Sequence, residues 1–126
     1  MPFVHVRSLP IAGDFDPAAA LPAISRAFSH DTGIDEERVT VTWEMIAPHH
    51  YAHAGATATE QADDSHPVLV DVLAPDFHPA ERIEAMLRSV AASVASAAGV
   101  GATNVFVAFS AARSGHVFDD GDVVRW

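Results

Sequence analysis

The sequence DFDPA at Asp14–Ala18 returns as DFHPA at Asp76–Ala80, 62 residues later. A second similarity follows in the same order. Thr32–Trp43 contains Thr-Gly-Ile and then Val-Thr-Val-Thr-Trp, and Ala98–Phe109 contains Ala-Gly-Val and then Val-Phe-Val-Ala-Phe, 66 residues later. A fixed period in a sequence marks a repeated structural unit. The two similarities therefore indicate that the chain is built from two related halves.

The first half, residues 2–46, predicts a strand, a helix and a second strand. Residues 2–9 are strand-like. Asp16 can cap a helix whose first position is Pro17, where the missing N–H costs nothing. Val39–Ile46 is rich in β-branched and aromatic residues, as is typical of a strand.

The second half, residues 67–111, predicts the same order of elements. Pro67–Ala74 is an almost unbroken apolar run, Pro79 opens a helix, and Asn104–Ala111 forms the closing strand. Apolar residues recur at helical spacing along one face of this helix. They are Ile83, Leu87, Val90, Val94 and Ala98.

Two strand–helix–strand units side by side predict the fold class: an α+β domain over residues 1–126, with a four-stranded mixed sheet and both helices on one face. Val68–Ala74 and Val105–Phe109 are apolar on both alternating faces except at Asp71. Such strands are usually covered on both sides. Because two helices cover only one face, we expect the other face to pack against further subunits of a homo-oligomer.

A connecting arm and a tail lie outside the two halves. The arm, residues 47–66, is long for a loop in a small domain, and its alternation over 51–59 favours a short hairpin. The tail, residues 115–126, predicts a turn at Asp119–Gly121 and one last short strand able to pair with a neighbouring subunit.

The arm concentrates histidines and aspartates, whose side chains can bind metal ions. Pro48 and Gly55 argue against a helix, so the spacing between ligands is not fixed, and we predict solvated side chains and no metal site. The residues concerned are His49, His50, His53, His66, Asp63 and Asp64.

Composition excludes several classes of function. The 126 residues include 17 Asp and Glu against seven Arg, for a net charge of −10, so the chain lacks the basic stripe of a nucleic-acid reader. Without Cys or Lys it has no thiol nucleophile, thiolate metal site or Schiff-base lysine. The apolar stretches are too short to span a membrane, and the start has no secretory signal, so we expect a cytosolic protein.

A Met-Pro start followed by an alternating strand, with a βαβ unit present twice, resembles the tautomerase superfamily. That superfamily includes 4-oxalocrotonate tautomerase, macrophage migration inhibitory factor, and fused two-unit dehalogenase and decarboxylase branches. The resemblance covers roughly residues 2–111 and implies a homotrimer that acts on a small molecule without a cofactor. It also implies that Met1 is removed and that Pro2 becomes the catalytic N-terminal residue.

A free N-terminal proline has suitable chemistry for moving protons. An unperturbed α-amine has a pKa of about 7.7–8.0, and an apolar pocket lowers it by disfavouring the charged form. A general base whose pKa is near neutrality transfers protons efficiently at neutral pH. Phe3, Val4 and Phe106 are candidates for the walls of that pocket, and the resemblance assigns to Phe106 the place beside Pro2.

The carboxylate-binding arginines of the family are not matched. Ala12 and Thr40 stand near the positions where 4-oxalocrotonate tautomerase carries Arg. We therefore expect a substrate carboxylate to be held by arginines at other positions. The candidates are Arg7, Arg38 and Arg113, each of which could instead form a surface ion pair.

Three functions remain open. The first is a tautomerase or isomerase in which Pro2 acts as general base on a small carbonyl or enol acid. The second uses a protonated Pro2 for hydration, dehalogenation or decarboxylation of a small acid. The third is a non-catalytic oligomeric binding module that has lost the arginine clamp.

Overall fold

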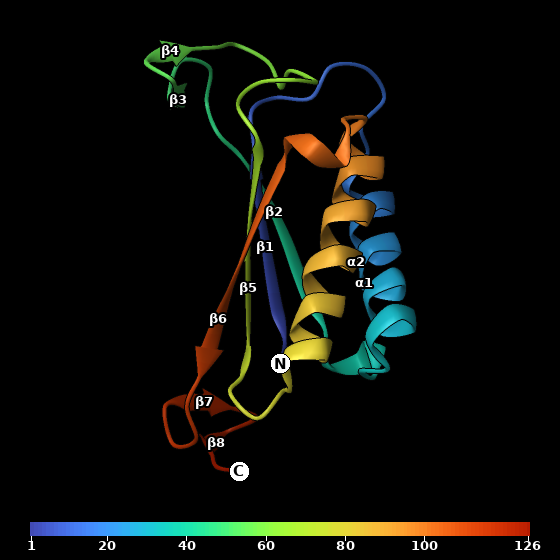
Figure 1. The fold of residues 1–126 in the computed structure, drawn as a ribbon, viewed down its shortest axis with the longest axis vertical. Helices are drawn as coiled ribbons and strands as arrows, with labels where there is room; N and C mark the ends of the chain where they lie inside the picture. Colours follow the sequence, from blue (N-terminus) through green and yellow to red (C-terminus); the bar gives the residue numbers. More distant parts are fainter.

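Four strands form the central sheet of the computed structural model, which describes residues 1–126 (Figure 1). They are β1 (Phe3–Ser8), β2 (Thr40–Met45), β5 (Val68–Pro75) and β6 (Val105–Ala112), in the order β2-β1-β5-β6. Each outer pair, β1–β2 and β5–β6, is parallel, and the central pair β1–β5 is antiparallel. This is the mixed sheet expected from two βαβ units.

Two helices pack on one face of the sheet, as expected (Figure 1). They are α1 (Pro17–Thr32) and α2 (Ala80–Ala98). The Asp16 side chain accepts a hydrogen bond from the Ala18 amide at 3.0 Å, which confirms the predicted cap. Short 3₁₀ turns, η1 (Glu36–Arg38) and η2 (Ala102–Asn104), precede β2 and β6. Neither long helix is apolar enough to cross a membrane.

Each half is followed by a small hairpin, one in the arm and one in the tail. β3 (Ala52–His53) pairs with β4 (Ala56–Thr57), so the arm contains the expected hairpin. β7 (Val117–Asp119) pairs with β8 (Asp122–Val124) across the predicted turn. The expected single last strand is thus two strands, paired within the chain, because Asp120 and Gly121 both adopt the positive φ of a two-residue hairpin turn.

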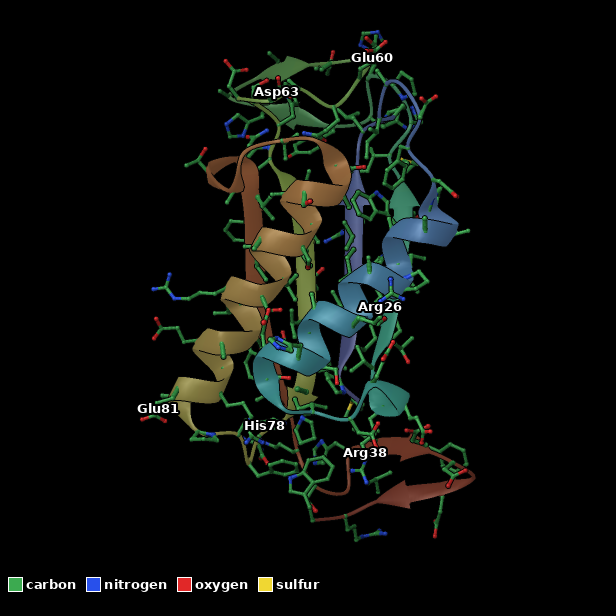
Figure 2. The ribbon with its side chains drawn as sticks, turned by 90° about the vertical axis from the view of Figure 1, so that its right-hand side faces the viewer. Arg26, Arg38, Glu60, Asp63, His78 and Glu81 are labelled. Atoms are coloured by element: carbon green, nitrogen blue, oxygen red, sulfur yellow. The ribbon has the colours of Figure 1, made fainter.

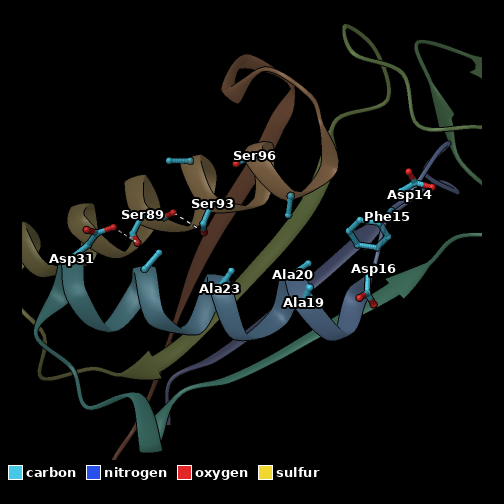
Figure 3. Close-up of a pocket in the computed structure, with 13 residues that line it drawn as sticks. Asp14, Phe15, Asp16, Ala19, Ala20, Ala23, Asp31, Ser89, Ser93 and Ser96 are labelled. Carbon is cyan, nitrogen blue, oxygen red and sulfur yellow. Dashed lines mark hydrogen bonds between the residues drawn. The ribbon is translucent and has the colours of Figure 1, made fainter.

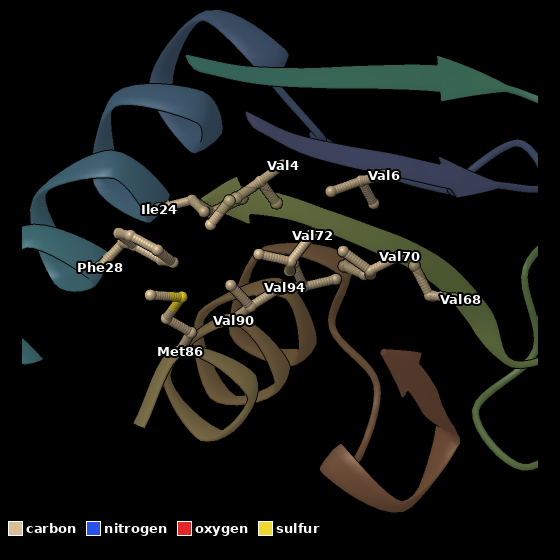
Figure 4. Packing of buried hydrophobic residues seen from close by; sticks show 12 residues of the cluster. Val4, Val6, Ile24, Phe28, Val68, Val70, Val72, Met86, Val90 and Val94 are labelled. Atoms are coloured by element: carbon tan, nitrogen blue, oxygen red, sulfur yellow. The ribbon is translucent and has the colours of Figure 1, made fainter. Parts of the chain in front are cut away.

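The core lies between the sheet and the helices (Figure 4). Alternate side chains of β1 and β5 point into it and meet one face of each helix, so both halves share a single core. Its twelve buried members are Val4, Val6, Ile24, Phe28, Val68, Val70, Val72, Ala74, Met86, Val90, Val94 and Ala98.

The helix-free face of the sheet is less uniformly apolar than expected. Exposed apolar side chains gather on β5, β6 and the start of β1, where Phe106 is 59% and Leu73 36% exposed. On β1 and β2 the same face carries charges, because Arg7 donates to Asp71 at 2.8 Å and His5 lies 3.2 Å from Glu44. Asp71, the exception in the apolar pattern, is therefore paired.

Candidate functional site at the start of β1

Pro2 is fully buried immediately before β1. Its carbonyl accepts a hydrogen bond from the Thr40 amide at 3.0 Å, which joins it to the edge strand β2. The N-terminus lies at the same end of the molecule as β7 and β8 (Figure 1). Burial and pairing fix the proline ring in a defined place.

Two cavities meet at Met1. One has a volume of about 440 Å³ and the other about 310 Å³, and both are lined by Met1, Arg38 and Phe77. These volumes lie near the lower end of those known for small-molecule sites. Because Met1 is bonded to Pro2 and lines both cavities, its removal would expose the proline nitrogen where they meet.

Three arginines line these cavities. Arg38 comes from η1 and lines both, Arg82 from the first turn of α2 lines the smaller, and Arg125 after β8 lines the larger. None of the three lies within 4 Å of a carboxylate oxygen, whereas Arg7 and Arg88 are both in ion pairs. Unpaired guanidinium groups in a protein of net charge −10 provide a local site for an anion.

The C-terminal end forms an aromatic wall of the larger cavity. Trp126 packs edge-on against Phe77, with ring centroids 5.8 Å apart, and its indole N–H donates to Asp76 at 2.8 Å. The Trp126 amide also donates to Ser114 Oγ at 2.8 Å. These contacts join the C-terminal hairpin to the loop that precedes α2.

His78 lines the smaller cavity together with Arg38 and Arg82. Figure 2 shows His78 and Arg38 at the same end of the molecule, near the C-terminal hairpin. The Nδ1 atom of His78 is buried and has no hydrogen-bond partner. Burial, and then the positive charge of Arg82, lowers the pKa of His78 and so favours the neutral form of the ring.

Solved structures show which fold this is. Pt0534, in a crystal structure inactivated by 2-oxo-3-pentynoate, is 16% identical with a TM-score of 0.83, over 97% of this chain and 94% of that one. A wild-type fused 4-OT described as a symmetric trimer is 16% identical with a TM-score of 0.81, over the same shares. N1, of the cis-3-chloroacrylic acid dehalogenase family, is 17% identical with a TM-score of 0.77, over 97% and 82%.

This chain has the tautomerase fold. No protein-family model matches the sequence, and a search of the curated proteins finds no match. At identities of 16–17% the structures establish the fold, while the chemistry depends on this chain's own residues.

Among the predicted site residues, the structure brings Arg38 to both cavities that Met1 lines. Arg113 is exposed just after β6 and lines neither cavity. Arg7 lies on the helix-free face, paired with Asp71. Within one tautomerase-fold chain, Arg38 is thus the only one of the predicted arginines at the candidate site.

Phe106 is not beside Pro2 within one chain. β6 runs parallel to β5, whose last residues lie next to the start of β1, so Phe106 pairs with Leu69 at the opposite end of the sheet. The residue of β6 that lies level with Phe3, through Leu73 of β5, is Ser110. Phe106 instead contributes to the exposed helix-free face.

The histidines of the arm hold its hairpin in place. His66 is buried, and its Nε2 lies 2.7 Å from the Ala56 carbonyl. His49 Nδ1 lies 2.9 Å from Thr57 Oγ1, and Tyr51 donates to the Pro67 carbonyl at 2.8 Å. No three His, Asp or Glu side chains are grouped so that they could hold a metal ion.

A further groove runs between the two helices, on the side away from the sheet (Figure 3). It has a volume of about 620 Å³ and is lined mainly by Ala and Ser. Ser89 of α2 donates to Asp31 of α1 at 2.6 Å, and this bond, with a smaller effect of His30, lowers the pKa of Asp31. The groove shares no lining residue with the two cavities at Met1, and its polar groups connect the helices.

Residues that sequence analysis missed supply most of the site: His78, Arg82, Arg125, Phe77 and Trp126. One sequence signal pointed to His78. In the repeated motif it stands where the first half has the capping Asp16, and His is not a preferred helix cap. In the structure α2 begins one position later than the repeat implies, with Pro79 as N-cap and no side-chain capping bond.

Proposed function

We propose that this chain is a tautomerase-superfamily enzyme in which Pro2, freed by removal of Met1, is the general base. The carrying observation is that a fully buried Pro2 lies next to two cavities that meet at Met1 and hold three unpaired arginines. The fold shared with Pt0534 and fused 4-OT supports the same assignment. The proposed activity needs no cofactor, and the proposed location is the cytosol.

Pro2 carries the proton in this proposal. A freed secondary amine in an apolar setting has a pKa below the ordinary value of about 7.7–8.0, so much of it is unprotonated at neutral pH. Its nitrogen takes a proton from the enol oxygen, or from the carbon next to a carbonyl. It then returns the proton at the other position. The ring has few conformations to restrict, and the Thr40 hydrogen bond fixes its carbonyl.

The arginines hold the substrate acid. Arg38 and Arg82 line the smaller cavity with one carboxylate, Asp35, whose side chain already accepts from the Glu37 amide at 3.1 Å. Guanidinium groups bind carboxylates through paired hydrogen bonds and stabilise negative charge that develops on an enolate oxygen. Because the whole molecule repels anions, this local positive charge is needed for an acid substrate to bind.

A homotrimer is part of the proposal. Fused 4-OT structures are described as trimers, and the helix-free face of this chain carries exposed Phe106, Leu73 and Phe3. A neighbouring subunit would cover these side chains and bring its own Phe106, Arg7 or Arg113 toward a shared site. The substrate contacts predicted for these three residues, which one chain alone does not make, would then be made between subunits of the proposed trimer.

The test is labelling by 2-oxo-3-pentynoate. We expect the intact mass of the purified protein to lack Met1 and to rise by one molecule of the reagent, with the label on the N-terminal peptide at Pro2. Pro2→Ala should lose at least about 100-fold in kcat/KM on phenylenolpyruvate or 2-hydroxymuconate, the size usual for loss of a general base. A mature protein that retains Met1, or full activity in Pro2→Ala, would refute the role of Pro2.

Similarity to N1 favours a second candidate, in which a protonated Pro2 assists hydration or dehalogenation of a small acid. The two differ in the pKa of the Pro2 nitrogen, which an NMR titration of the ¹⁵N-labelled proline measures. A pKa below 7 supports tautomerisation, and one well above 7 supports the hydratase. If the protein binds these acids equally well with and without Pro2→Ala and turns over none of them, the chain is a non-catalytic binding module.

A further inference from the structure

The two cavities at Met1 differ in their charge. The smaller one has Arg38 and Arg82 against the single carboxylate of Asp35. The larger one has Arg38 and Arg125 against Asp119 and Asp120. If Arg38 is engaged by a substrate carboxylate in the smaller cavity, the larger cavity keeps one cation and two carboxylates.

The two aspartates of the larger cavity have no ion-pair partner. Neither has an arginine nitrogen within 4 Å, and the only hydrogen bond that their side chains make is the one that Asp119 Oδ1 accepts from the Asp120 amide at 2.9 Å. The tight turn fixes both, since Asp120 has a φ of 50° and Gly121 a φ of 84°. Two uncompensated carboxylates at a fixed place repel a third.

The rest of the larger cavity is apolar or aromatic. Its walls include Pro75, Phe77, Val117, Val124 and Trp126. Trp126 is held by bonds to Asp76 and Ser114, and Phe77 packs against it. This surface favours an uncharged, preferably aromatic, group and cannot replace the hydration of an anion.

We propose that the C-terminal hairpin makes the site selective for monocarboxylic keto or enol acids with an uncharged tail, and that Asp119 and Asp120 exclude acids with a second carboxylate. The carboxylate lies between Arg38 and Arg82, and the tail lies against Phe77 and Trp126. The inference rests on the proposed function for the location of the site. It adds the property that discriminates one substrate from another.

The first experiment compares kcat/KM for phenylenolpyruvate, a monoacid, with that for 2-hydroxymuconate, a diacid. We expect the wild type to prefer the monoacid. The double variant Asp119→Asn/Asp120→Asn should reduce the ratio of kcat/KM for the monoacid to kcat/KM for the diacid by at least about fivefold. The reason is that two exposed negative charges that repel the second carboxylate are removed. Asn keeps the acceptor oxygen and tolerates positive φ, so the turn persists. Asp122→Asn, in the same hairpin but outside the cavity, is the matched control and should not alter the ratio.

A binding experiment with acids that cannot react tests this inference separately from the proposed function. NMR titrations with 3-phenylpropanoate and adipate, which have no enol or keto group to isomerise, follow the arginine side-chain signals. Tighter binding of 3-phenylpropanoate, with the difference reduced in the double variant and in high salt, supports the inference even if no substrate is turned over. Equal binding of the two acids, or a ratio that the double variant leaves unchanged, overturns it even if the enzyme is active.

Discussion

His78 illustrates at the residue scale how a repeated motif can acquire a new role. The first half uses Asp16 to cap α1, and the second half has His78 at the matching position with no capping bond. Because it does not cap the helix, the His78 ring is free to line the smaller cavity, where it packs against Phe77 with ring centroids 4.5 Å apart. Its Nδ1 atom is buried without a hydrogen-bond partner, which is rare for a polar atom in a folded protein.

Arg82→Gln should raise the pKa of His78, because one of the two causes that lower it is the charge of Arg82. An NMR titration should show a pKa for His78 below the ordinary value of about 6.5 and a move toward that value in the variant. Since the lowered pKa opposes protonation in the folded state, His78 contributes stability that is present above pH 6.5 and is lost as pH falls below it. Arg88→Gln, on the same helix but paired with Glu84, is the control. An unchanged pKa in Arg82→Gln would contradict this electrostatic coupling.

Single residues were predictable from the sequence only where the determinant is local. Asp16 followed by Pro17 specifies a helix start in two residues, and the structure has that cap. By contrast, Arg38 and Arg82 are 44 positions apart and meet only because the antiparallel pairing of β1 and β5 places the two units head to tail. Nothing local in the sequence distinguishes them from Arg7, whose partner Asp71 is set by strand register.

At the scale of elements, each hairpin closes the end of the sheet where the other unit begins (Figure 1). β3–β4 lies near the start of β5, where Tyr51 bonds to Pro67, and β7–β8 lies near Pro2. The alternation in the arm predicted the first hairpin, whereas for the tail the sequence predicted only the turn and a single strand, not two strands paired within the chain. The sequence did not reveal that the two are equivalent, because their residues differ and only their positions in the fold correspond.

Ala54→Gly should stabilise the β3–β4 hairpin. Its turn residues Ala54 and Gly55 have φ of 51° and 80°, and a side chain at Ala54 costs about 1 kcal/mol in this left-handed region. Hydrogen exchange of the His49 amide, which bonds to the Ala58 carbonyl at 2.9 Å, measures the opening of the hairpin. We expect exchange to slow by up to about fivefold. The observed slowing is smaller than the relief of strain alone would give, because glycine also adds conformational entropy to the open form of the hairpin. Ala56→Gly, in the adjoining strand, should speed it; faster exchange in Ala54→Gly would show that the turn is not strained.

At the scale of the whole molecule, one side of the sheet is unprotected. The helices bury Val4, Val70 and the rest of the core, while β5 and β6 expose their alternate residues on the opposite face. The apolar pattern of both strands predicted this, since it exceeds what two helices can cover. In the proposed trimer, the Arg7–Asp71 and His5–Glu44 pairs would add polar contacts that orient the neighbouring subunit without a large gain in affinity.

Phe106→Asp should therefore dissociate the proposed trimer. The ring is 59% exposed in one chain, and a carboxylate in its place would be buried without a partner between subunits. Each chain already carries −10, so the trimer would carry three times that charge, and a further negative charge at the contact adds repulsion. Analytical ultracentrifugation should give about 40 kDa for the wild type, three times the 13.3 kDa chain, and a monomer for the variant at the same micromolar concentration.

The control is Ala92→Asp, exposed on the outer side of α2, which adds the same charge away from the sheet and should leave the trimer intact. A wild type that sediments as a 13.3 kDa monomer would mean that the helix-free face is stable in water, and a trimer that survives Phe106→Asp would place the contact on another surface.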